Sequence, residues 1–114
     1  MKIVYQNSEV LTFVKQSTEE MEIGAYGEKW LSFMREHYPK LVLEMQLKGI
    51  LYKVAQAVDD IAWDYRDLLD RQYMELHPRP EMSFEKIAAW EQTRAFYTDS
   101  AVMREKVLIP RSTV

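Results

Sequence analysis

The chain has 114 residues, of which 47% are apolar, and its 18 acidic and 15 basic residues give a net charge of −3. This length predicts a single domain over 1–114, and this composition supplies enough apolar surface for a core. The acidic balance disfavours a dedicated nucleic-acid module, and the lack of cysteine excludes disulfides and thiolate metal sites. No apolar run is long enough for a membrane span, so we expect a cytoplasmic protein.

Residues 1–16 have the pattern of a β-hairpin. Residues 2–5 and 10–14 are rich in β-branched and aromatic side chains, and the polar residues 6–9 between them are typical of a turn. A two-stranded hairpin is only marginally stable alone in water. We therefore expect this hairpin to pack on the helices or to pair with another chain.

Residues 17–110 are predicted to form a helical body whose first helix covers 25–38. Ser17 and Glu20 make a capping-box pattern, but Gly24 and Gly27 follow it and would each weaken a helix. Two explanations remain open at this point. Either a short turn forms at 17–22 before the helix proper, or a glycine face allows another backbone to approach closely.

Proline and glycine mark the second helix, which is predicted over 39–48. Proline suits the first position of a helix and disfavours helix in the residue before it, so Pro39 separates this helix from the previous one. Gly49 is placed to cap its C-terminus in the left-handed conformation.

The longest predicted helix covers 50–77 and contains no interior Gly or Pro. At 1.5 Å per residue it would reach about 40 Å, which exceeds the width of a compact domain of this size. Its apolar residues recur with helical spacing and predict one buried row. The row consists of Leu51, Val54, Val58, Ile61, Tyr65 and Leu68.

The last helix is predicted over 84–107, with Ser83 as its N-cap and residues 111–114 as a tail. A proline-rich connection before it places the last two helices next to each other as an antiparallel hairpin. The predicted fold is therefore mainly α, with a short N-terminal β-hairpin followed by about four helices. Two helices of this length are expected to complete their core by dimerisation, so we expect a homo-oligomer.

Three short motifs, taken in order, are similar to those of a known family. They are Ile23-Gly24-x-Tyr26-Gly27, Arg35-Glu36-His37-x-Pro39-x-Leu41 and Gly49-x-Leu51-Tyr52, with weaker support from Ala62 and Ala89-Trp90. On these residues the chain resembles the TnpV family of transposon-encoded proteins. The resemblance implies a small protein of transposons and conjugative elements, mostly of firmicutes, with no established activity and no catalytic residues to carry over.

Two groups of residues are candidate contact sites. Trp63 and Tyr73 lie off the apolar row of their helix, so they are expected to meet the last helix or a second chain. With Tyr26 and Trp90 they form the predicted protein interface. The alternative is a nucleic-acid contact through basic residues near the C-terminus, although acidic residues alternate with them as in an exposed mixed-charge helix. These basic residues are Arg94, Arg104, Lys106 and Arg111.

Asp60, Asp64 and Asp67 share one side of the long helix and could suggest a carboxylate metal site. No histidine accompanies them, so a solvated acidic face is the preferred interpretation and no metal or cofactor is expected. The sequence also lacks a nucleophile–base set and a phosphate-binding loop. It predicts a non-enzymatic accessory or regulatory protein of a mobile element, with a DNA-associated factor as the alternative.

Overall fold

The computed structural model describes residues 22–113, so the β-hairpin predicted for 1–16 and the capping box at Ser17 lie outside the described residues. Within 22–113 the chain forms four α-helices and one π-helical turn, and no strand. The elements are α2 (Ala25–His37), α3 (Pro39–Lys48), α4 (Leu51–Leu76), α5 (Phe84–Val102) and η1 (Met103–Val107). None of these helices combines the length and the apolarity that a bilayer crossing requires.

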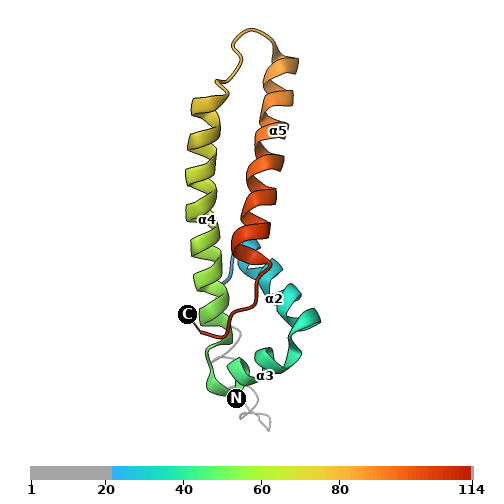
Figure 1. Cartoon of the computed structure of the whole chain (residues 1–114), viewed down its shortest axis with the longest axis vertical. Coiled ribbons are helices and arrows are strands. Elements are labelled where there is room, and N and C mark those ends of the chain that lie inside the picture. Colours follow the sequence, from blue (N-terminus) through green and yellow to red (C-terminus); the bar gives the residue numbers. More distant parts are fainter. Residues whose placement is uncertain (1–21, 114) are drawn as a thin grey trace.

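Helices α4 and α5 run antiparallel as a long hairpin, and α2 and α3 pack near its open end (Figure 1). The molecule measures 63 × 26 × 20 Å. We call residues 59–102 the hairpin, residues 63–97 within it the distal hairpin, and residues 22–58 with 103–113 the base. The predicted mainly helical fold and its terminal helical hairpin are confirmed for the described residues.

Local capping signals place most of the helix ends as predicted. Gly49 adopts φ +73° after α3, and the next amide, of Ile50, donates to the carbonyl of Met45 at 2.9 Å. Ser83 caps α5 because its hydroxyl accepts a hydrogen bond from the amide of Lys86. These short-range contacts satisfy backbone groups that a helix end leaves unpaired.

The last predicted helix, 84–107, ends where predicted, but its final five residues are π-helical. The backbone leaves the α-helical pattern after Val102 and forms the wider turn η1, in which the amide of Leu108 donates to the carbonyl of Met103. The wider turn contains more residues than an α-helical turn, and it brings Val107 into the core with 0% exposure.

The predicted apolar row of α4 is correct near the base and wrong farther out. Leu51, Val54 and Val58 are buried, but Ile61 is 40% exposed and Leu68 is 42% exposed. The buried positions continue instead through Ala62 and Leu69. The predicted row runs from 51 to 68 in five steps, about 3.4 residues each, whereas an α-helix has 3.6 residues per turn. The row therefore drifts around α4 and leaves the buried face along its length.

The N-terminus of α2 is attached to the middle of α4 by one carboxylate. Oδ1 of Asp59 accepts hydrogen bonds from the backbone amides of Tyr26 and Gly27, each at 3.0 Å. A Cβ atom on Gly27 would lie 2.7 Å from the carbonyl oxygen of Ala55, and one on Gly24 would collide with the Asp59 carboxylate. Another backbone therefore approaches closely at Gly27, whereas the close neighbour at Gly24 is a side chain. The turn considered for 17–22 lies outside the described residues.

We expect Gly27→Ala to destabilise the fold by about 1–3 kcal/mol, because the added methyl group meets a backbone carbonyl that cannot move without shifting α4. The measurement is the free energy of unfolding from urea titration. Ser32→Ala is the matched control, since Ser32 is exposed on the same helix, and it should change the stability by less than about 0.5 kcal/mol. Equal stability of the two variants would contradict the close-approach explanation.

Candidate functional site

The distal hairpin has almost no core of its own. Between residues 63 and 97 only Leu69 is buried. Several large apolar side chains in this segment are instead in contact with solvent, among them Leu76 at 76%, Phe96 at 76% and Tyr97 at 53% exposure. Monomeric proteins seldom leave large apolar side chains clustered on their surface, and such clusters tend to mark interaction sites.

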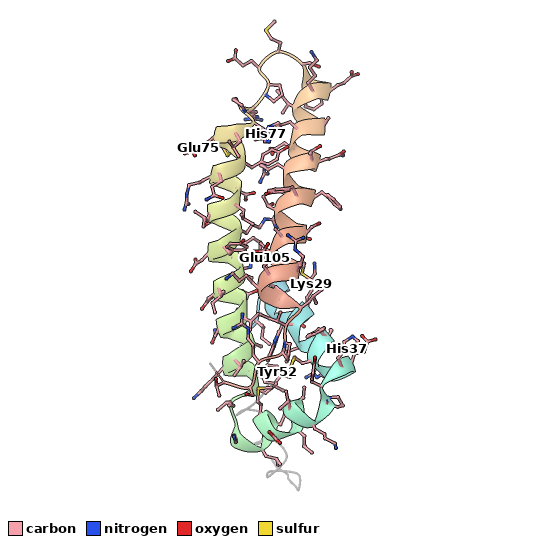
Figure 2. All side chains as sticks on the ribbon, viewed as in Figure 1. Lys29, His37, Tyr52, Glu75, His77 and Glu105 are labelled. Atoms are coloured by element: carbon pink, nitrogen blue, oxygen red, sulfur yellow. The ribbon has the colours of Figure 1, made fainter. Side chains whose placement is uncertain are left out.

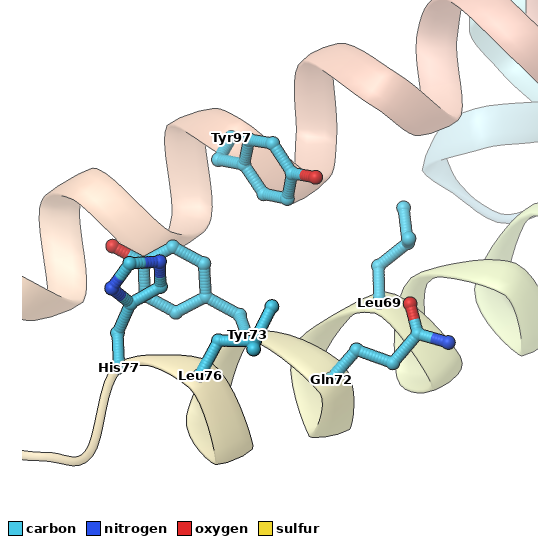
Figure 3. A pocket seen from close by; sticks show the side chains of 6 residues that line it. All are labelled: Leu69, Gln72, Tyr73, Leu76, His77 and Tyr97. Carbon is cyan, nitrogen blue, oxygen red and sulfur yellow. The ribbon is translucent and has the colours of Figure 1, made fainter.

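A hollow of about 190 Å³ opens between α4 and α5 in the distal hairpin. Figure 3 shows Leu69, Tyr73 and Leu76 of α4 on one wall and Tyr97 of α5 on the other. Gln72 and His77 complete the lining. In Figure 2, His77 and Glu75 lie at the far end of the hairpin, distant from Lys29, His37 and Tyr52 of the base.

Tyr73 is the centre of an aromatic cluster that joins the two helices. Its ring centroid lies 4.6 Å from that of His77, 5.7 Å from that of Tyr97 and 6.0 Å from that of Trp90. The indole nitrogen of Trp90 also donates a hydrogen bond of 2.8 Å to the carbonyl oxygen of His77, where α4 ends. The cluster therefore fixes the two helices relative to each other close to the connecting loop.

Charged side chains join α4 to α5 nearer the middle of the hairpin. The guanidinium of Arg94 donates to Asp70 at 2.7 Å and to Glu91 at 2.9 Å, and its side chain is only 20% exposed. The hydrogen bond to the carboxylate of Glu91, reinforced by Asp70, raises the pKa of Arg94. Arg66 extends this network, because it lies 3.9 Å from Asp70 on the same helix.

The hydroxyl of Tyr26 continues the network into the base. It donates a hydrogen bond of 2.6 Å to Asp99 of α5 and accepts one of 2.9 Å from Arg66 of α4. Burial, together with the hydrogen bond to Asp99, raises the pKa of Tyr26 to about 12, while Arg66 acts in the opposite direction. Three helices therefore meet at one phenol group.

The predicted interface residues occupy different environments. Tyr26 is buried at 2% exposure, so it lies inside the base and offers no contact surface. Trp63 packs edge-on against the Tyr26 ring at 4.9 Å and is 42% exposed. Tyr73 and Trp90 are partly buried in the aromatic cluster, which confirms the expected contact of Tyr73 with the last helix.

The predicted nucleic-acid residues do not form one group. Arg94 is held by two carboxylates, as described above. Arg104, whose side chain is 68% exposed, pairs with Glu105, and the ammonium of Lys106 lies 4.9 Å from the centre of the Tyr65 ring. Arg111 donates to the carbonyl oxygen of Lys106 at 3.2 Å. The last three residues belong to the base.

No group of three or more residues suited to metal binding occurs within 22–113. Sequence reasoning did not identify Asp59, Arg66 and Asp99, which organise the contacts between α2 and the hairpin. Their partners lie 33, 40 and 73 positions away in the chain, so no local spacing in a single sequence marks these pairs.

The raised pKa of Tyr26 predicts a loss of stability in alkali. Folding favours the protonated phenol, because the pKa is about 12 in the folded chain and about 10 when unfolded, so this contribution is complete below pH 10 and is lost as the pH rises towards 12. Urea midpoints measured from about pH 8 to 11 should fall more steeply for the natural chain than for Tyr26→Phe. Parallel curves for the two proteins would contradict this role of Tyr26.

The comparisons with known proteins agree with the motifs in the sequence. A search of curated proteins gave no match, and a search of solved structures gave none either. The family model described as transposon-encoded protein TnpV matches residues 10–108. This range covers most of the chain and contains all three motifs from Ile23 to Tyr52. The chain therefore belongs to the TnpV family of transposon-encoded proteins.

Proposed function

We propose that this chain is a non-enzymatic accessory or regulatory protein of a transposon or conjugative element, and that it acts in the bacterial cytoplasm by binding another protein chain through the distal hairpin. The observation that carries the proposal is the exposure of large apolar side chains on a hairpin that extends beyond the core. The family supports the connection with mobile elements. The bound chain is either a second copy or another component of the element.

The distal hairpin is suited to binding because its scaffold is rigid and its outer side chains remain available. The cluster around Tyr73 and the ion pairs of Arg94 fix the two helices. Leu76 and Tyr97 then line an open hollow while more than half of each side chain is exposed. A fixed apolar patch of this kind loses little conformational entropy on binding.

The polar groups of the hairpin support a structural role better than a catalytic one. Arg94 and Arg66 of the hairpin, and Tyr26 of the base, form their hydrogen bonds with partners within the fold. A catalytic group needs a free position next to a substrate. We therefore assign no chemical step to these residues.

Leu76→Asp should reduce the function of the element. An element lacking its own copy of this gene would be complemented with the natural or the variant protein, and the excision or transfer frequency would be counted. We expect a decrease of at least about tenfold, since a charge in an apolar contact costs 1.4 kcal/mol or more.

Leu47→Asp is the matched control for this experiment. Leu47 is also a helical leucine, its 79% exposure is close to the 76% of Leu76, and it lies on α3 in the base. We expect it to support a frequency within about twofold of the natural protein. Equal frequencies for the two variants, with both proteins folded by circular dichroism, would rule out the distal hairpin as the binding surface.

The charge distribution favours a second candidate function, in which the base contacts DNA. The base contains eight basic and five acidic residues, whereas the hairpin contains five basic and ten acidic residues. Arg104, Lys106 and Arg111 all belong to this positive part of the molecule. Phosphate contacts from such a surface release counterions, so binding would depend steeply on salt.

If the base binds DNA, three phosphate contacts give a slope of about −2.7 in a plot of log affinity against log salt concentration. The measurement is the fluorescence anisotropy of a generic labelled duplex. Arg104→Ala should reduce the slope by about 0.9, whereas Arg71→Ala, an exposed site on α4, should leave it unchanged. The absence of binding at low salt would exclude this candidate.

A further inference from the structure

We infer that a second copy of this chain binds to one exposed row of α4, in an antiparallel arrangement related by a two-fold axis. This inference rests on the proposed function, because it names the chain that the hairpin binds. The exposed row consists of Ile61, Tyr65, Leu68, Gln72 and Leu76, all of them exposed except Tyr65, which is partly buried and donates a hydrogen bond to Glu105 of η1.

The exposed row has the spacing of a helix–helix seam. Its successive members are separated by 4, 3, 4 and 4 residues, which keeps them on one side of the helix over about 22 Å. None of them is charged, and Ile61, Leu68 and Leu76 are 40%, 42% and 76% exposed. The row therefore forms an uncharged stripe that is exposed except at Tyr65, with Glu75 beside its distal end.

The hairpin needs a further surface to pack against. Leu69 is the single buried residue of the distal hairpin, and helices in proteins owe most of their stability to tertiary packing. The radius of gyration is 19.0 Å, whereas a compact domain of about 100 residues has a value near 13 Å. A second hairpin laid on the first would supply the missing layer of a four-helix bundle.

The exposed row is complementary to itself, which favours a second copy as the bound chain. Consider a two-fold axis that passes between positions 68 and 69. It places each residue opposite the residue of the second copy for which the two residue numbers add up to 137. Ile61 then meets Leu76 of the second copy, Tyr65 meets Gln72, and the two Leu68 side chains lie next to each other beside the axis. The row is thus mapped onto itself with large residues opposite large residues, as an isologous interface requires.

One charge beside the exposed row, that of Arg71, agrees with this register. Asp64, Asp67 and Arg71 are exposed on the flank of the row that faces away from α5. The same axis places Arg71 opposite position 66 of the second copy, between Asp64 and Asp67. A basic side chain therefore lies among acidic ones. Glu75 of the same flank, opposite position 62, comes between Asp60 and Asp64, so acidic side chains also meet at each end of the row. A parallel arrangement would place every charge opposite its own copy.

The absence of cysteine from the chain allows a direct test with single substitutions. Leu68→Cys should form a disulfide-linked dimer in micromolar protein under mild oxidation, because the two Cβ atoms lie near the axis within reach of a disulfide. Gln92→Cys is the control, since residue 92 is exposed on α5 away from the row, and it should stay largely monomeric. Urea should abolish the difference between them.

A mixture of two further variants tests the register. Ile61→Cys and Leu76→Cys should each cross-link poorly alone, because each residue is far from its own copy, whereas an equal mixture should give the heterodimer. Efficient cross-linking of Ile61→Cys alone would show a parallel pair and overturn the inference. Equal cross-linking of Leu68→Cys and Gln92→Cys would overturn it as well.

Light scattering separates this inference from the proposed function. We expect a dimer for the natural chain and a monomer of equal helix content for Leu68→Asp. If the natural chain is monomeric throughout the micromolar range, the inference of a second copy is overturned. A loss of excision with Leu76→Asp would then still support binding of another protein. A cross-linked dimer with unchanged excision in Leu76→Asp would confirm the second copy and overturn the proposed function.

Discussion

The hydrogen bonds between the Asp59 carboxylate and the first turn of α2 determine how the base is built on the hairpin. Two backbone amides that would otherwise lack partners donate to one anionic oxygen, and the positive end of the α2 dipole faces the same charge. The short distance requires glycine at position 27, where a Cβ atom would meet the carbonyl oxygen of Ala55. Once α2 is held there, Tyr26 reaches Arg66 and Asp99, and Trp30 donates to the carbonyl of Ile109 in the C-terminal segment.

Beyond this attachment the hairpin is held by ion pairs and aromatic contacts in place of a wide apolar core. Such contacts are directional, so they define the spacing and rotation of two helices, but each adds little free energy in a partly exposed setting. Arg94 and Tyr73 therefore specify the geometry of α4 and α5. The apolar surface that would normally stabilise two long helices stays on the outside of the molecule.

The elements that depend on neighbouring residues could be predicted from the sequence, and the contacts between distant residues could not. Pro39, Gly49 and Ser83 set helix ends through local backbone chemistry, and all three were identified. The buried face of α4 was misplaced at Ile61 and Leu68, because the predicted row advances about 3.4 residues per step while the buried face follows the 3.6-residue period of the helix. Of the candidate site, the contact of Tyr73 with α5 was predicted, whereas the capture of Arg94 by Asp70 depends on the exact rotation of both helices.

The unequal charges of the two parts of the chain also influence how the molecule approaches others in solution. A positive base and a negative hairpin at opposite ends of a 63 Å long molecule produce a large electric dipole along its axis. A polyanion would be attracted towards the base, and a cationic protein towards the hairpin, before any contact forms. The charge distribution thus orients approaching molecules relative to the long axis, and this electrostatic steering weakens as the ionic strength rises.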